Sequence, residues 1–296
     1  LGVSGDAPDE ALRALQSALG ALPEGRTVAP VRIEAARPSG LSVEIIEKDT
    51  RATAISLGAP IDVTRAHPDF VALSVARAWL GEHRITSGQL FQRIREVRGI
   101  NYGDYAYIEA FPRAMFQFFP DPNVARRRQL FEIWIRPVVP ANAHMTLRIA
   151  LHELDLLVQN GLTAAQFDAT RSYLMNNVYV MTSTQDQQLG YALDSSWYGI
   201  GEFTAFMRQG LERLTLEQVN RAIRTHLNAR DLSIVCITRD GAALKQALEN
   251  DAPSSIRYDG NKPPSLLAED QVIGARKLNI AASSIVVTPV SEVFAR

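Results

Sequence analysis

Histidines are the side chains in this 296-residue sequence best suited to binding a metal, and there are five of them: His67, His83, His144, His152 and His226. A helical zinc site needs two histidines one turn apart with a glutamate beside them, as in His-Glu-x-x-His or its inverse, His-x-x-Glu-His. Glu153 follows His152, but Leu156 occupies the position of the second histidine. No histidine has glutamate three and histidine four residues further on. The spacing therefore predicts no metal ligands in this chain.

Nucleophile and phosphate-binding motifs are also absent from the sequence. It contains no Gly-x-Ser-x-Gly elbow, no Gly-x-x-x-x-Gly-Lys-(Ser/Thr) loop and no Gly-x-Gly-x-x-Gly fingerprint. Cys236 is the single cysteine, so an internal disulfide is impossible, and its apolar run at 232–237 indicates a buried thiol.

Arg95 and Tyr102 are the pair with the clearest chemical potential. The helical repeat gives segment 87–98 one apolar stripe, made of Leu90, Phe91, Ile94 and Val97. Arg95 falls just off this stripe, Gly99 ends the helix, and Tyr102 opens a strand, so a guanidinium and a phenol can converge. Both groups donate hydrogen bonds, which suits a peptide carbonyl or a developing oxyanion. The pair is equally compatible with ordinary surface structure, so its chemistry alone leaves both interpretations open.

Charge and hydropathy exclude some functions. The 31 basic and 32 acidic side chains give a net charge of −1, which argues against a nucleic-acid partner. The basic run 126–128 follows a turn and is typical of a solvated loop. No apolar stretch reaches the 18 residues that a transmembrane helix needs, so no membrane partner is expected. The single cysteine fits the cytoplasm and does not exclude the periplasm, which leaves the localisation open.

The order of the expected elements predicts the fold class. Alternating or apolar runs predict strands near 41–48, 51–59, 102–111, 129–139 and 231–238, the first two as a hairpin around Asp49-Thr50. Helical patterns cover 8–22, 68–82, 87–98, 147–158, 165–181, 185–210, 216–227 and 242–249, with an interruption around Gly199 and Gly201. Strands that come in pairs and helices that come in blocks predict an α+β fold, with a largely antiparallel sheet and helices packed on one face. Residues 23–40 are expected to form a linker, and 251–296 an extended tail with one strand-like patch near its end.

The segment from Ser87 to Tyr102 resembles the pitrilysin/insulinase family of zinc metallopeptidases. That family shows a small-small-x-Leu-(Phe/Tyr)-x-x-(Ile/Leu)-Arg pattern followed by Gly-(Leu/Ile)-x-Tyr. The pattern is matched here by Ser87 to Phe91 with Ile94-Arg95, and then by Gly99 to Tyr102. Further similarities lie at 54–58, at His67-Pro68, at 163–169 and at 214–219, so the resemblance covers about residues 1–250.

The resemblance implies a specific role. Residues 1–22 would be the end of a preceding subdomain, and 41–250 a C-terminal subdomain of the non-zinc half. Arg95 and Tyr102, seven residues apart, would contact the substrate carbonyl, whereas Arg98 is only four residues from Tyr102. Zinc would come from a missing part or a partner, so this chain would carry no cofactor of its own and is expected to be inactive alone. The implied partners are a peptide or unfolded protein substrate and a zinc-bearing half. A structural subunit or a peptide-binding subunit without catalysis remains the alternative.

Overall fold

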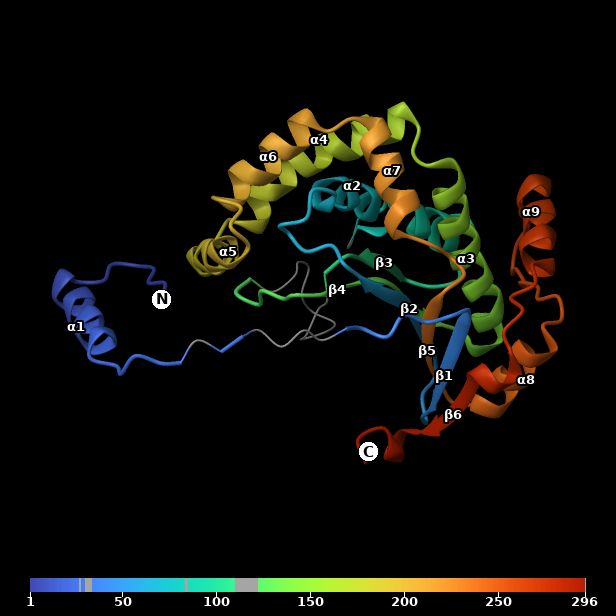
Figure 1. Ribbon diagram of the computed structural model, residues 1–296. Coiled ribbons are helices and arrows are strands. Elements are labelled where there is room, and N and C mark those ends of the chain that lie inside the picture. The colour runs from blue at the N-terminus through green and yellow to red at the C-terminus, as the bar shows by residue number, and fades with distance from the viewer. Residues whose placement is uncertain (27, 30–33, 83–84, 110–121, 296) are drawn as a thin grey trace.

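A six-stranded mixed sheet lies at the centre of the computed structural model, which describes residues 1–26, 28–29, 34–82, 85–109 and 122–295 (Figure 1). The strands follow the order β3-β4-β2-β5-β1-β6. Their bounds are β1 Leu41–Glu47, β2 Thr53–Ile61, β3 Gly103–Tyr107, β4 Gln129–Val138, β5 Leu232–Thr238 and β6 Ile285–Pro289. The predicted strands are therefore present, although residues 110 and 111 of one prediction lie outside the described part of the chain.

The pairing of β1 differs from the predicted hairpin around Asp49-Thr50. Strand β5 lies between β1 and β2, parallel to β1 and antiparallel to β2, and β1 also pairs in parallel with β6. The pairs β2–β4 and β3–β4 are antiparallel, so the sheet is mixed with an antiparallel majority. Register explains the result: Cys236 lies opposite both Ile45 and Ile55, so β5 places its apolar side chains between two apolar strands.

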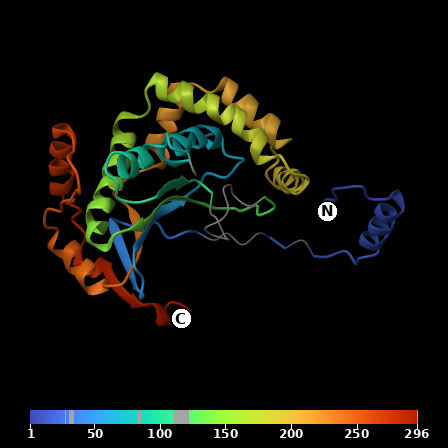
Figure 2. The same ribbon diagram turned by 180° about the vertical axis from the view of Figure 1, so that it is seen from behind.

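One face of the sheet carries the core. The inward side chains of the central strands are at most 3% exposed, namely Val43, Ile45, Ile55, Leu57, Ile133, Ile135, Ile234 and Cys236. The residues that alternate with them along the strands point to the other face and are partly exposed, as at Ser56, Trp134 and Val235. In Figures 1 and 2 the helices cover a single face of the sheet, which confirms the predicted α+β arrangement. The burial of Cys236 raises the pKa of its thiol to about 12, as expected for an inert core residue.

Most helices lie close to their predicted ranges. Their bounds are α1 Asp9–Gly20, α2 Phe70–Gly81, α3 Ala143–Asn160, α4 Ala164–Met181, α5 Gln185–Tyr198, α6 Phe203–Arg213, α7 Leu216–His226, α8 Gly241–Asn250 and α9 Pro264–Ala275. The segment predicted at 185–210 is divided between α5 and α6 at the expected interruption. Short 3₁₀ turns lie at η2 Pro140–Asn142, η3 Ala282–Ser284 and η4 Val290–Glu292. Thr163 with Gln166 and Thr215 with Gln218 form capping boxes, which explains why α4 and α7 start where the sequence predicts. No helix among the described residues is long and apolar enough to cross a membrane.

Residues 251–296 are not the extended tail that the sequence predicts. They contain helix α9, which packs against α3, and edge strand β6, which matches the predicted strand-like patch. Arg148 of α3 is fully buried and ties this segment to the body of the protein. Its guanidinium donates to the Asp251 carboxylate at 2.7 Å and to the carbonyl of Gly274 at 2.6 Å.

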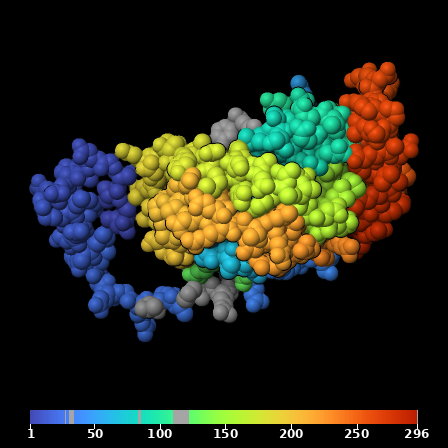
Figure 3. Space-filling model, turned by 90° about the horizontal axis from the view of Figure 1, so that it is seen from above, coloured from blue at the N-terminus to red at the C-terminus, as the bar shows by residue number. Residues whose placement is uncertain are grey.

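The N-terminal segment extends away from the sheet and carries α1, in which no residue is buried (Figure 1). Seen from above, the helix layer forms a continuous cover, and the segment with α1 lies beside it (Figure 3). Gly2 lies close to the side chains of Leu189 and Leu193, so the start of the chain contacts α5. The predicted division into a subdomain end at 1–22, a linker at 23–40 and a subdomain at 41–250 stays a prediction.

Candidate functional site

Helix η1, Phe91–Glu96, and the start of strand β3 build the candidate site. The sequence predicts an α-helix at 87–98, whereas the structure has a turn at 86–87, two α-helical residues and then the six-residue π-helix η1. Leu90 and Ile94 are fully buried and anchor this segment to the core. Gly99 ends it with a φ of +69°, a left-handed conformation that glycine adopts without strain. π-Helical turns are frequent at functional sites.

The structure brings Arg95 and Tyr102 together. The guanidinium carbon of Arg95 lies 5.6 Å from the centroid of the Tyr102 ring, within the range of a cation–π contact. Tyr102 is 71% exposed, which is high for an aromatic side chain, and Arg95 is half-buried. Within the described ranges Arg95 makes no ion pair, and the Tyr102 hydroxyl makes no hydrogen bond. Both polar groups are therefore available to a third molecule.

The neighbouring arginines have structural partners instead. Arg98 is 3% exposed and donates to Asp270 and Glu269 of α9, at 2.7 Å in each case. Arg93 pairs with Glu153 of α3 at 3.0 Å and also with Glu269. These contacts fix η1 between α3 and α9. They also explain why Arg98, the competing arginine of the sequence motif, is not available to a ligand.

Asp104 is a member of the site that sequence reasoning missed. It lies in β3 two residues after Tyr102, is 1% exposed, and accepts a hydrogen bond from the Asn101 side chain. Its Oδ2 has no hydrogen-bond partner among the described residues. Burial raises the pKa of the Asp104 carboxyl to about 7, although Asn101 and the nearby Arg95 act in the opposite direction. A carboxyl in an otherwise aromatic strand was the available signal, but only the packing shows that it is buried.

Asp104 should make stability depend on pH. Because its pKa is raised above the ordinary value of 3.8, the folded state holds a proton that the unfolded state releases, and stability should fall as pH rises from about 4 to 7. A tenfold difference in proton affinity is worth about 1.4 kcal/mol. Water that enters the site relieves part of the cost of burying the ionised carboxylate. We therefore expect Asp104→Asn to stabilise the protein on the order of 2 kcal/mol at pH 8. Urea unfolding at pH 4 and pH 8 measures the effect. A gain of the same size at both pH values would contradict a raised Asp104 pKa.

The described histidines are dispersed, with one exception. His144 and His152 lie on α3, where burial lowers the pKa of both, to about 4 for His144. His83 lies outside the described residues.

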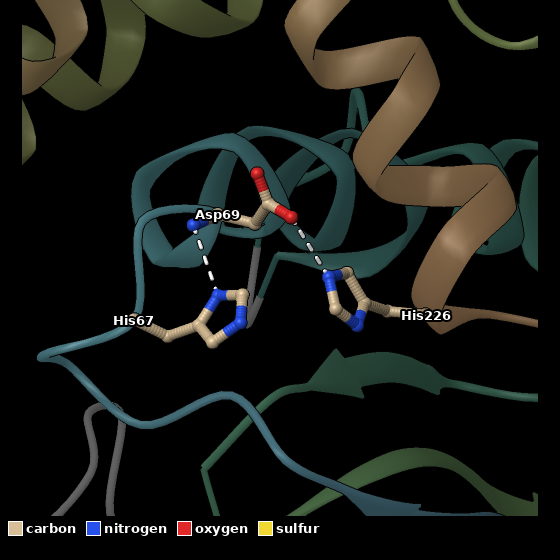
Figure 4. A group of neighbouring side chains, drawn as sticks. All are labelled: His67, Asp69 and His226. Carbon is tan, nitrogen blue, oxygen red and sulfur yellow. Dashed lines mark hydrogen bonds and ion pairs between the residues drawn. The ribbon is translucent and has the colours of Figure 1, made fainter.

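His67 and His226 approach each other on either side of Asp69, although 158 residues separate them in the sequence (Figure 4). Ligand atoms of His67, Asp69 and His226 all lie within 4.8 Å of one another. The search by local spacing missed this group because its members come from distant segments.

Several solved structures share this fold. The peptidase M16 inactive domain from Pseudomonas fluorescens has 26% identity and a TM-score of 0.57, over 77% of this chain and 50% of the other. The first half of the periplasmic protease PqqL from Escherichia coli has 16% identity and a TM-score of 0.56, over 93% and 55%. A chain of complex III2 from Candida albicans has 12% identity and a TM-score of 0.60, over 80% and 54%. This protein therefore spans about half the length of these chains.

The chain is an α+β domain with the fold of these structures, and its sequence carries no His-x-x-Glu-His motif. A family model described as the peptidase M16 inactive domain matches residues 1–174. The chain belongs to the M16 peptidase family, as its inactive domain, which confirms the resemblance to the pitrilysin/insulinase peptidases. A comparison with curated proteins found no match.

Proposed function

We propose that this chain is the substrate-positioning, non-zinc part of a pitrilysin/insulinase-type peptidase. In this role Arg95 and Tyr102 contact the scissile carbonyl, or the oxyanion that forms from it, during hydrolysis of a peptide or an unfolded protein. The zinc and the general base come from another part of the protein or from a partner. The histidines of this chain do not form the family's zinc motif.

The observation that supports this proposal best is the free Arg95–Tyr102 pair. Arg93 and Arg98, the other arginines of this segment, are held by carboxylates. Among the described residues, Arg95 instead meets the ring of the exposed Tyr102 and the field of Asp104. A guanidinium and a phenol side by side offer several N–H donors and one O–H donor to a carbonyl oxygen. Donors placed where negative charge develops lower the barrier to acyl transfer.

Replacing Arg95 by alanine tests the proposal in the complete, zinc-bearing protein. The side chain is half-buried and unpaired, so its loss should not affect folding, but it removes a cationic donor from the carbonyl. We expect kcat/KM for a fluorogenic peptide to fall at least about tenfold, since a hydrogen bond to a charged group contributes about 1.5–3 kcal/mol.

The matched control is Arg208→Ala. Arg208 of α6 lies over the ring of Tyr179 at 5.2 Å, so it also forms an arginine–tyrosine pair, although it additionally pairs with Glu212 and donates to the carbonyl of Met175. This variant should cleave the peptide at the wild-type rate. Unchanged kcat/KM in Arg95→Ala, with an unchanged melting temperature, would favour the alternative of a structural or peptide-binding subunit. A zinc assay on the complete protein separates a peptide-binding module from a peptidase.

A further inference from the structure

His67, Asp69 and His226 form a cluster between two helices of the layer that covers the sheet. His67 lies in the loop before α2, Asp69 occupies the N-cap of α2, and His226 is the last residue of α7. Figure 4 shows the two imidazole rings on either side of the Asp69 carboxylate. The rings meet edge-on with their centroids 5.2 Å apart, and all three residues are partly accessible. The cluster is therefore compact and open to solutes.

The Asp69 carboxylate is held ionised between its neighbours. Its Oδ2 lies 2.9 Å from Nε2 of His226, and its Oδ1 accepts from Arg221 at 2.8 Å. Burial alone would raise the pKa of Asp69, but the hydrogen bonds from His226 and Arg221 hold it below its ordinary value. Nδ1 of His67 accepts from the backbone N–H of Asp69 at 3.0 Å. Two imidazoles and one carboxylate oxygen thus face one another, with Arg221 on the remaining carboxylate oxygen.

We propose that His67, Asp69 and His226 bind one divalent transition-metal ion of the zinc class and thereby join α2 to α7. Two imidazoles and a carboxylate are a common ligand set for such ions, and water completes the tetrahedron. Bonds of about 2.0–2.2 Å require ligand atoms roughly 3.5 Å apart, so the cluster closes by about 1 Å around the ion. The C-terminal end of α7, where carbonyl groups are unpaired, also favours a cation at His226.

Binding of the metal ion replaces two hydrogen bonds that are present in the structure. The ion takes the place of the proton between His226 Nε2 and Asp69 Oδ2, and His67 turns a ring nitrogen to it in exchange for the bond with the Asp69 N–H. Arg221 remains hydrogen-bonded to Oδ1 of Asp69, and its positive charge repels the ion. Its side chain is 60% exposed, so it can be removed without opening the core.

Metal titration of the 296-residue chain, freed of metal by a chelator, tests the site. Calorimetry with Zn²⁺ and visible spectroscopy with Co²⁺ should both give one ion per chain. His67→Ala leaves the Asp69–His226 pair intact and should weaken binding roughly 100-fold or more. Arg221→Ala should tighten binding severalfold by removing the opposing charge. Saturating Zn²⁺ should raise the melting temperature of the wild type by about 5 °C. It should leave the melting temperature of His67→Ala unchanged.

His152→Ala is the matched control, because His152 lies on α3 outside the cluster. This variant should bind Zn²⁺ with the wild-type affinity and stoichiometry. Two results would overturn the proposal: a wild-type chain that binds no Zn²⁺ or Co²⁺, or a His67→Ala variant that binds them as tightly as the wild type does.

Discussion

Replacing Tyr102 by phenylalanine should lower kcat for peptide cleavage by the zinc-bearing protein about 10²–10³-fold, with the fold intact. The change keeps the aromatic ring over which the Arg95 guanidinium lies and removes only the hydroxyl. Tyr102 is 71% exposed, so the missing oxygen leaves no buried cavity and no unpaired partner. If the hydroxyl donates to the oxyanion, its contribution grows as negative charge develops on the carbonyl oxygen. The loss should therefore fall on kcat more than on KM.

The Tyr102 measurement needs steady-state kinetics and a melting curve for each variant. Tyr179→Phe is the matched control, because Tyr179 is also exposed and also lies beneath an arginine, Arg208. It should leave both kcat and KM unchanged. Wild-type turnover by Tyr102→Phe would remove the catalytic role of the hydroxyl. A rise in KM alone would instead assign Tyr102 to substrate binding that is equal in the ground and transition states.

Replacing Arg148 by leucine should destabilise the chain by about 3–5 kcal/mol, the usual cost of leaving one member of a buried ion pair without its partner. The guanidinium is fully buried and makes four hydrogen bonds, to the Asp251 carboxylate, to the carbonyls of Ala252 and Gly274, and to Ser254 Oγ. Asp251 also accepts from the backbone N–H groups of Leu278 and Asn279. The variant should therefore release the segment that carries α9 and β6 before the rest of the sheet unfolds.

Urea unfolding and limited proteolysis check the Arg148 prediction. Cleavage within 252–263 should become faster in Arg148→Leu. Arg171→Leu, a change at a partly exposed arginine of α4 that pairs with the exposed Asp168, should match the wild type. Adding Asp251→Asn to Arg148→Leu should recover part of the loss, because the stranded charge disappears and asparagine tolerates the φ of +45° at this position. A single variant as stable as the wild type would show that other contacts hold the C-terminal segment.

The Arg148 result bears on the candidate site as well. Glu269 and Asp270 of α9 bind Arg98 and Arg93, and Lys262 donates to the carbonyl of Val97 at 2.7 Å. The C-terminal segment thus holds η1, from which Arg95 projects. A loosened segment should reduce peptide cleavage even though none of its residues is proposed to contact the substrate. Adding Asp251→Asn, which recovers part of the stability, should recover part of the lost cleavage activity.

The sequence by itself determined those features of this protein that depend on neighbours along the chain. Apolar periodicity located the helices before residue 251, and the capping boxes at Thr163 and Thr215 marked the starts of α4 and α7. Alternation located the strands, because burial of one sheet face repeats every second residue. The Arg95–Tyr102 pair could also be predicted from the sequence, because Gly99 ends one element and Tyr102 begins the next within a single motif. Their convergence at 5.6 Å followed from this short connection.

Only the tertiary structure decided which distant segments meet. Nothing near Asp49-Thr50 shows that β5 lies between β1 and β2, because strand pairing depends on apolar surface contributed by the whole chain. The proline-rich composition after residue 253 suggested an extended tail, but contacts with α3 stabilise a helix there. Burial likewise converts Asp104 from an ordinary acid to one with a raised pKa. The cluster of His67, Asp69 and His226 exists only because α2 and α7 pack together, and no local spacing rule can detect ligands that folding brings close across 158 positions of sequence.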